Sequence, residues 1–319
     1  ANLEKNYPDN SHLLFVHGLL VGENGDYPLA LRYMEQARVK NPHSIPIILL
    51  EARILTVSKQ EKKAIAFLEA ALIDNPKSHQ LNLHYARALI AVKDYLAAEK
   101  KLSQLIAIAP NNPETQLMHA LLAYDNKHDE AAIASLNRLI ALQSHEEEAY
   151  YYLAMIAKRQ DKLDDTEKYL SQINEGDRYL SAQIELATLR IKSDRLSQAR
   201  QQLTESRQQH PELASTLYAV EIELLNNNKL EETAYLLVLE AIKQFPNDNL
   251  LLFSRALMAD KRQELAQFEL DMRELLRRDP NNPSYMNAFG YTLADKTDRL
   301  AEAEPYLRRA FKLKPNDPA

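Results

Sequence analysis

Prolines recur about every 34 residues in this chain, and their spacing constrains its fold more than any other feature. Pro42, Pro76 and Pro110 are separated by 34 residues each. Ser144 and Arg178 occupy the next two corresponding places, and the series then resumes at Pro211, Pro246, Pro280 and Pro315. Because a proline cannot continue the hydrogen bonds of a helix, each of them marks a helix end. The period therefore predicts nine similar helical units from about residue 11 onward.

Two further positions in each unit usually carry a small residue. The first position holds, in order, Gly18, Ala52, Ala86, Ala120, Ala154, Ala187, Ile222, Ala256 and Gly290. The second holds Ala30, Ala64, Ala98, Ala132, Thr166, Ala199, Ala234, Phe268 and Ala303. A hydrogen or a methyl group lets two helices approach closely, whereas a leucine would overpack the contact at roughly 1–3 kcal/mol. We expect the first position to face the second helix of its own unit, and the second position to face the next unit.

A 34-residue unit with this layout is typical of the tetratricopeptide repeat, in which a turn joins two antiparallel helices. The composition agrees, because the chain has only five Gly and no Trp and is rich in good helix formers. The predicted fold is all-α, with about nine helix-turn-helix repeats in a right-handed superhelix whose first helices line a concave face. We predict a single array over residues 1–319, with repeats at about 11–44, 45–78, 79–112, 113–146, 147–178, 179–212, 213–247, 248–281 and 282–316.

The repeat pattern is least regular at two places. Glu175, Gly176 and Asp177 replace the proline turn between the fifth and sixth units, so we expect the curvature to change there. Pro305 lies inside the second helix of the last unit, where proline should kink or strain the helix by about 3 kcal/mol. Gly290 also lies in a predicted helix, and we attribute it to close helix packing.

Residue patterns that carry catalysis or metal binding are weak in this sequence. The nine His residues show no pair with the spacing of a helical zinc site, and the chain has no Cys. The glycine cluster at 18–25 lacks the Lys-Ser/Thr of a phosphate-binding loop and is interpreted as a turn. The net charge of −6 disfavours nucleic-acid binding, and no run of 18 apolar residues predicts a membrane span. We therefore expect a protein that is not an enzyme and uses no cofactor or metal.

A binding surface for proteins or extended peptides is what remains. Ligands of such repeats lie along the first helix of each unit, at its second, fifth, ninth, twelfth and thirteenth positions. The candidate partner-binding residues at these positions are Arg53, Arg87, Tyr124, Tyr151, Met155, Lys158, Phe253, Asn287 and Tyr291. Two successive arginines beside tyrosines would suit an acidic or carboxylate-bearing extended segment. The Lys and Asn pattern that clamps the tails of heat-shock chaperones does not occur in consecutive units.

Several longer strings resemble one particular family of repeat proteins. "YYYLAMIAKRQDKLDDTEKYLSQINEGDRYLSAQIELATL", "NAFGYTLADKTDR" and "KPNDPA" resemble proteobacterial outer-membrane lipoproteins with tetratricopeptide repeats. The resemblance implies a periplasmic adaptor that binds a carboxyl-terminal processing protease and presents murein hydrolases to it for degradation. It also implies an N-terminal lipid that anchors the protein to the outer membrane and further repeats after the last one, so we interpret the sequence as a fragment of a longer chain.

Two other interpretations stay open at this point. The array could be the substrate-recognition part of a larger enzyme, or it could be a general chaperone or secretion adaptor in the cytoplasm. We also expect some self-association through the terminal repeats, around Phe311 and Leu313, because the end of an array presents an apolar face.

Overall fold

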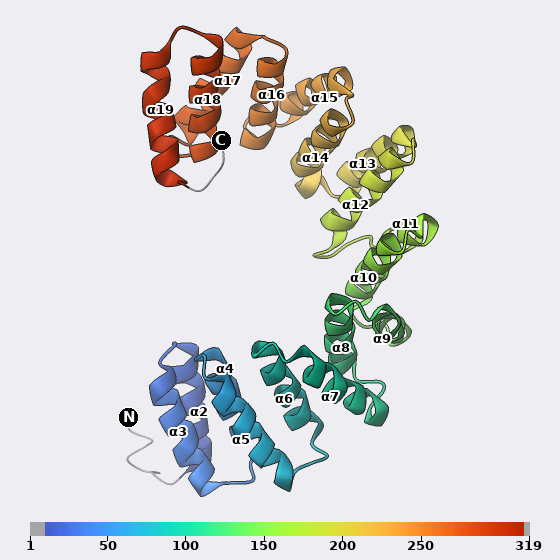
Figure 1. Cartoon of the computed structure of the whole chain (residues 1–319), viewed down its shortest axis with the longest axis vertical. Coiled ribbons are helices and arrows are strands. Elements are labelled where there is room, and N and C mark those ends of the chain that lie inside the picture. The colour runs from blue at the N-terminus through green and yellow to red at the C-terminus, as the bar shows by residue number, and fades with distance from the viewer. Residues whose placement is uncertain (1–9, 316–319) are drawn as a thin grey trace. The chain divides into compact units, whose positions relative to one another are not determined.

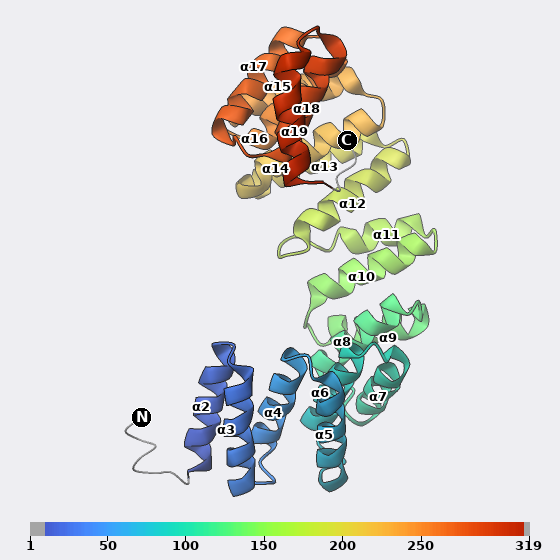
Figure 2. The same cartoon turned by 60° about the vertical axis from the view of Figure 1, so that its left-hand side comes forward.

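The computed structural model describes residues 10–315, and within them it contains α-helices and one short 3-10 helix. The helices form nine successive pairs, and the two helices of a pair lie next to each other in Figures 1 and 2. In order, they are α2 (Ser11–Glu23), α3 (Tyr27–Lys40), α4 (Ile45–Val57), α5 (Glu61–Asp74), α6 (His79–Ala91), α7 (Tyr95–Ile108), α8 (Pro113–Asp125), α9 (Asp129–Ala141), α10 (Glu146–Arg159), α11 (Leu163–Leu170), α12 (Tyr179–Lys192), α13 (Leu196–Gln209), α14 (Ala214–Asn227), α15 (Glu231–Gln244), α16 (Asn249–Lys261), α17 (Leu265–Arg278), α18 (Pro283–Lys296) and α19 (Leu300–Leu313). The predicted all-α fold of nine helix pairs is confirmed. The handedness of the superhelix and its continuity as a single array stay predictions.

The first helix of each pair, called the A helix here, carries the even-numbered labels, and the second, the B helix, carries the odd-numbered ones. Each A helix packs against its own B helix, and within each of the two compact units described below the B helices pack against the A helix of the next pair. Successive A helices also contact one another, as α4 contacts α6 and α14 contacts α16. This packing makes the A helices a continuous layer within each part of the chain, as expected for such repeats.

Helix starts follow from polar residues placed next to the repeat prolines. The side chain of Asn112 accepts a hydrogen bond from the backbone N–H of Thr115 at 2.9 Å, and Pro113 is the first residue of α8. Asn282 caps α18 in the same way, ahead of Pro283. Proline is tolerated there because the first N–H groups of a helix have no partner within the helix. Both helix starts therefore combine an asparagine cap with a proline in the first turn.

The turn between the A and B helices repeats as a single backbone conformation in eight of the nine described pairs. One residue of each of these turns has a positive φ, namely Gly25, Lys59, Lys93, Lys127, Asp161, Asp194, Lys229 and Gln263. At the non-glycine positions φ lies between 57° and 64°. The glycine cluster at 18–25 is thus a turn only at its end, since Gly18 and Gly22 lie within α2. In the last pair, α18 instead ends at Thr297, whose backbone is extended.

Close packing of A against B explains the glycines at the first small position. A Cβ atom on Gly290 would lie 2.8 Å from Cγ of Leu307 and 3.1 Å from the carbonyl oxygen of Ala303. On Gly18 it would lie 2.2 Å from Cε of Met34. The contacts of Gly290 are with the B helix of its own pair, so the predicted role of this position is confirmed there.

The chain divides into two compact units, Ala1–Gln172 and Ile173–Ala319. The division falls beside Glu175, where the repeat pattern is least regular, and it follows α11, which has only 8 residues. In the second unit α19 continues from Leu300 to Leu313 through Pro305, whose side chain is exposed. Phe311 and Leu313 at the end of α19 are also exposed, and self-association through them stays a prediction.

Candidate functional site: the A-helix face

Two arginines predicted to bind partners lie at equivalent places on adjacent A helices of the first unit. Arg53 lies on α4 and Arg87 on α6, and both side chains are exposed. Arg87 forms an ion pair with Glu114 at the start of α8. Arg53 makes no hydrogen bond or ion pair with another residue in the described part of the chain. One guanidinium is therefore already held by a carboxylate, and the other is available.

The charges of both arginines affect the pKa of His84. This histidine lies on α6, and its pKa is lowered from the ordinary value of 6.5 by burial, then by the charge of Arg87 and, more weakly, by that of Arg53. The carboxylate of Glu114 acts in the opposite direction. Because both guanidinium charges act on one imidazole, the two arginines belong to one electrostatic region rather than to separate surfaces.

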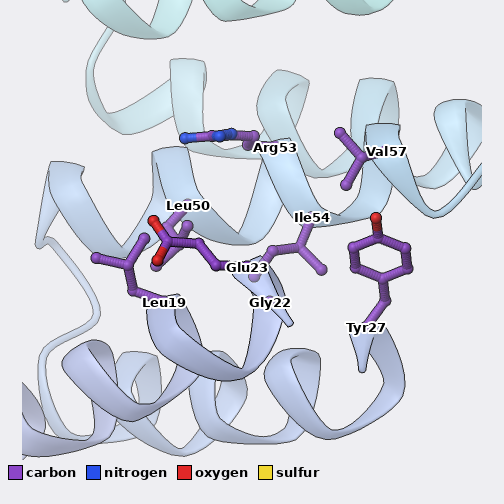
Figure 3. Close-up of a pocket in the computed structure, with 8 residues that line it drawn as sticks. All are labelled: Leu19, Gly22, Glu23, Tyr27, Leu50, Arg53, Ile54 and Val57. Carbon is purple, nitrogen blue, oxygen red and sulfur yellow. The ribbon is translucent and has the colours of Figure 1, made fainter. Parts of the chain in front are cut away.

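A pocket of about 310 Å³ opens beside Arg53, between α2, the start of α3 and α4 (Figure 3). It is lined by Leu19, Gly22, Glu23, Tyr27, Leu50, Arg53, Ile54 and Val57. Figure 3 shows Leu19, Gly22 and Glu23 on α2, with the Tyr27 hydroxyl directed toward the end of α4 that carries Val57. Four of the eight lining residues have aliphatic side chains, and a carboxylate, a phenol and a guanidinium form the polar part of the lining. The sequence predicted Arg53 but not the pocket.

An aromatic cluster lies further along the first unit, where α8 meets α10. The ring of Tyr124 contacts that of Tyr152 edge to face at 4.9 Å, and Tyr152 contacts Tyr151 at 5.7 Å. The guanidinium of Arg159 lies 4.8 Å from the Tyr124 ring and forms an ion pair with Asp129. The structure therefore brings the predicted residues Tyr124 and Tyr151 together through Tyr152.

Two other predicted residues, Met155 and Lys158, follow Tyr151 on α10. Met155 is half-buried, and Lys158 is exposed. Sequence reasoning missed Tyr152 and Arg159 in this cluster. Arg159 could have been found, because it is the thirteenth residue of the predicted repeat at 147–178, and the thirteenth is one of the expected binding positions. Tyr152 does not occupy such a position, and only the packing of the rings shows its role.

The remaining predicted residues lie in the second unit, on α16 and α18. The ring of Phe253 contacts Tyr285 at 5.1 Å, and burial raises the pKa of Tyr285, with smaller contributions from Asp279 and Asp248. Asn287 is half-buried, while Tyr291 is 59% exposed. Leu250 and Leu257, also on α16, are exposed apolar residues that the sequence reasoning did not single out. This face is more apolar than the arginine region of the first unit.

Buried charges elsewhere bind helices to one another. Glu221 is 1% exposed and accepts from Arg207 at 2.7 Å and from Arg200 at 2.8 Å, which joins α14 to α13. Asp271 is similarly buried and receives two hydrogen bonds from Arg255. Since each carboxylate is fully engaged by a neighbouring helix, these groups stabilise the pairs and offer no site to a partner.

The buried His119 is the described side chain that most resembles a catalytic group, but its surroundings do not support catalysis. Its Nδ1 lies 2.8 Å from the Ser135 hydroxyl and its Nε2 lies 3.1 Å from that of Ser103. Burial lowers its pKa below 6.5, partly offset by Glu99. The imidazole is 7% exposed, so a substrate would not reach it without opening the helix packing.

A search for metal-binding clusters and for membrane spans completes the survey. No group of three or more His, Asp or Glu side chains within residues 10–315 is arranged to hold a metal ion. The helices described there are also too short or too polar to cross a bilayer. The surfaces that can be assigned a role are thus the A-helix faces.

Comparison with known proteins supports the repeat assignment. The sequence model of the tetratricopeptide repeat family matches residues 23–88 and 59–123. The tetratricopeptide repeat-containing protein PA4667 of Pseudomonas aeruginosa is 38% identical over 149 residues, which cover 46% of this chain and 25% of that protein. The chain therefore spans about a quarter of the length of the relative that it matches.

Two solved structures of other proteins are similar to this chain at low sequence identity. The pilF protein of Pseudomonas aeruginosa has a TM-score of 0.50 and 14% identity, covering 63% of this chain and 92% of its own. A tetratricopeptide repeat protein from Parabacteroides merdae has a TM-score of 0.46 and 12% identity, covering 94% and 98% of the two chains. The paired helices, the 34-residue period and the matches over residues 23–123 together show that this part of the chain carries tetratricopeptide repeats, and that the described helices have the paired all-α fold of such repeats.

Proposed function

We propose that the chain is a non-enzymatic periplasmic adaptor, which binds a carboxyl-terminal processing protease and presents murein hydrolases to it. The binding role is supported mainly by one observation. Side chains at equivalent positions of successive A helices, Arg53 and Arg87 above all, stand exposed and are not used in the core. Repeat arrays of this kind use such faces as extended binding surfaces.

The identity of the partners rests on the strings between residues 150 and 319 that resemble the family of outer-membrane lipoproteins. The similarity to PA4667 supports a repeat protein and by itself names no partner. The adaptor needs no catalytic group, because it would accelerate degradation by holding protease and substrate together, which raises their effective concentration.

A reconstitution experiment tests this proposal. Purified protease and a murein hydrolase are mixed with and without this chain together with its flanking repeats, and the loss of intact hydrolase is followed with time. We expect faster degradation with the chain present and a bell-shaped dependence on its concentration, because excess scaffold separates the two partners. Absence of binding to both partners, measured with folded protein, would contradict the proposal.

The proposed location is the periplasm, with a lipid on the N-terminus as the anchor to the outer membrane. It is supported only by the resemblance. Fractionation of cells that express the full-length protein, followed by mass spectrometry of its N-terminal peptide, tests it. Recovery from the cytoplasm without a lipid would favour the chaperone interpretation.

A further inference from the structure

We propose that the A-helix face of α2, α4 and α6 binds an extended acidic segment, with one apolar side chain in the α2–α4 pocket and the following carboxylates on Arg53 and Arg87. This inference rests on the protein-binding role proposed above and names the chemistry of the bound segment. It does not depend on the partner being a protease or a murein hydrolase.

The pocket selects an apolar side chain. Leu19 from α2 and Leu50, Ile54 and Val57 from α4 supply aliphatic walls around a space of about 310 Å³. Binding sites usually combine apolar walls with a few placed polar groups, and the lining of this pocket has both. An aliphatic side chain that enters it leaves water for a hydrocarbon surface, which favours binding.

The two arginines set the charge of the segment and the spacing of its acidic residues. The axes of packed helices are about 8–10 Å apart, and a segment in the polyproline II conformation advances about 3.1 Å per residue with three residues per turn. Because α4 and α6 contact each other directly, such a segment that crosses them would pass from Arg53 to Arg87 in about three residues. Residues three apart lie on the same side of this conformation, so two carboxylates at that spacing would contact both guanidinium groups, which bind carboxylates well.

Two carboxylates of the protein, those of Glu23 and Glu114, affect how an acidic segment can bind. Glu23 lines the α2 side of the pocket, so an acidic residue placed on that side would be repelled. The acidic residues must then lie on the α6 side of the apolar one, the arrangement that the probes below carry with the Asp residues C-terminal to the Leu. Glu114 already pairs with Arg87, and it acts there as a competitor that the segment has to displace.

Labelled peptides of ten residues, acetylated and amidated at their ends, provide the test. The parent probe carries one Leu followed by two Asp three residues apart, within Gly and Ser. One derivative replaces both Asp by Asn, and another replaces Leu by Ser. Binding is measured by fluorescence polarisation with the whole chain and with the Arg53→Gln and Arg87→Gln variants. Arg32→Gln is the matched control, since Arg32 is an exposed arginine on α3.

A double-mutant cycle separates the charge contact from the apolar contact. We expect Arg53→Gln to weaken the parent probe by about tenfold or more. It should not weaken the Asn probe further, because the partner of Arg53 is already missing there. Replacing Leu by Ser should weaken binding equally in wild type and in Arg53→Gln. Arg32→Gln should leave all affinities unchanged.

A gain of affinity gives a result that misfolding cannot imitate. Glu114→Gln frees Arg87, so it should tighten the parent probe and leave the Asn probe unchanged. The gain should be only a few-fold, because the pair between Arg87 and Glu114 is exposed and therefore weak.

Three results would overturn the inference. They are equal affinity for the Asp and Asn probes, equal effects of Arg53→Gln and Arg32→Gln, and unshifted methyl resonances of Ile54 and Val57 with the parent probe at millimolar concentration. The same variants are also tested with the protease and the hydrolase. Probe binding that depends on Arg53 without any binding of those proteins would contradict the proposed function alone. Binding of those proteins without Arg53-dependent probe binding would contradict this inference alone.

Discussion

At the scale of single residues, Gly290 shows how little room the contact between an A and a B helix leaves. Its missing Cβ would meet Leu307 at 2.8 Å and a backbone oxygen at 3.1 Å. We predict that Gly290→Ala lowers the free energy of unfolding by about 1–2 kcal/mol, despite the better helix propensity of alanine, because the contact becomes overpacked. The midpoint of urea unfolding measures the effect.

Gly22→Ala is the matched control for this substitution. A Cβ on Gly22 would lie 3.6 Å from the nearest atom, which is ordinary contact, and Gly22 is also in a helix. We expect it to leave the midpoint unchanged or raise it slightly. If Gly290→Ala behaved like Gly22→Ala, the interpretation of Gly290 as a packing residue would be wrong.

The buried His119 predicts a dependence of stability on pH. Burial lowers its pKa below 6.5 in the folded chain, so between the two pKa values the unfolded chain binds a proton that the folded chain does not. The stability from the neutral imidazole is complete above about pH 6.5 and decreases as the pH falls through the lower, folded-state pKa. The midpoint of urea unfolding should therefore be lower at about pH 5.5 than at about pH 7.5.

In His119→Gln this difference should be smaller than in wild type. It should not vanish, because burial lowers the pKa of His84 as well and gives a dependence of the same sign. An unchanged difference between the two pH values would show that His119 does not titrate with folding.

At the scale of the helix pair, the turn between A and B helices uses a conformation that non-glycine residues adopt at a cost. Lys93 has a φ of 64°, in the left-handed region, which costs roughly 1–2 kcal/mol for a residue with a Cβ. We predict that Lys93→Gly raises the free energy of unfolding by up to about 1 kcal/mol, since glycine adopts this φ without strain. Urea unfolding of the whole chain checks the sign.

Lys100→Gly gives the opposite expectation with the same change of residue. Lys100 is exposed within α7, where glycine should destabilise the helix by about 1 kcal/mol. Destabilisation by both substitutions would mean that the turn of α6 and α7 gains more from the lysine side chain than from a relaxed backbone.

The sequence predicts the helix pairs well because proline and small residues act through local backbone chemistry and close contact. Asn112 and Pro113 mark the start of α8, and Asn282 and Pro283 mark the start of α18 in the same way. The left-handed turns could not be predicted in the same way, because Lys59 and Lys93 give no sign of a positive φ in the sequence. Their conformation is set by the two helices that they join.

The candidate site was only partly predictable for a related reason. Positions on the A helices indicated Arg53 and Arg87, but not that Glu114 from the next pair already holds Arg87. The pocket beside Arg53 is formed by three helices, so no single periodic pattern contains it. Sequence periodicity shows which face of a helix a residue occupies, whereas the third helix that completes a site becomes visible only in the packing.

At the scale of the whole molecule, stability should be local, because each helix pair contacts mainly its neighbours. Glu221 is buried between Arg200 and Arg207, and Glu221→Ala removes the only carboxylate that pairs with the buried Arg207 in the described residues. Removing one member of a buried pair costs about 3–5 kcal/mol, and we expect the lower part of this range because Arg200 is partly exposed. Amide hydrogen exchange, read by mass spectrometry, should show lost protection in α13, α14 and α15.

Protection in α2 to α5 should stay as in wild type under the same conditions, since those helices belong to the first unit. Glu223→Ala, the same change at an exposed glutamate on α14, serves as a comparison for nonspecific effects. A uniform loss of protection along the chain would show that the molecule unfolds as one cooperative system instead.

The segment between α11 and α12 has a consequence for how the chain can be cut. Residues 171–178 are the longest stretch without a helix between the described helices, and Asn174, Glu175, Gly176 and Asp177 are all exposed. A protease needs accessible, non-helical backbone, so brief digestion with a glutamate-specific enzyme should cut first after Glu175. The two fragments would correspond to the two compact units, each with intact helix pairs, and each could be assigned its own ligands.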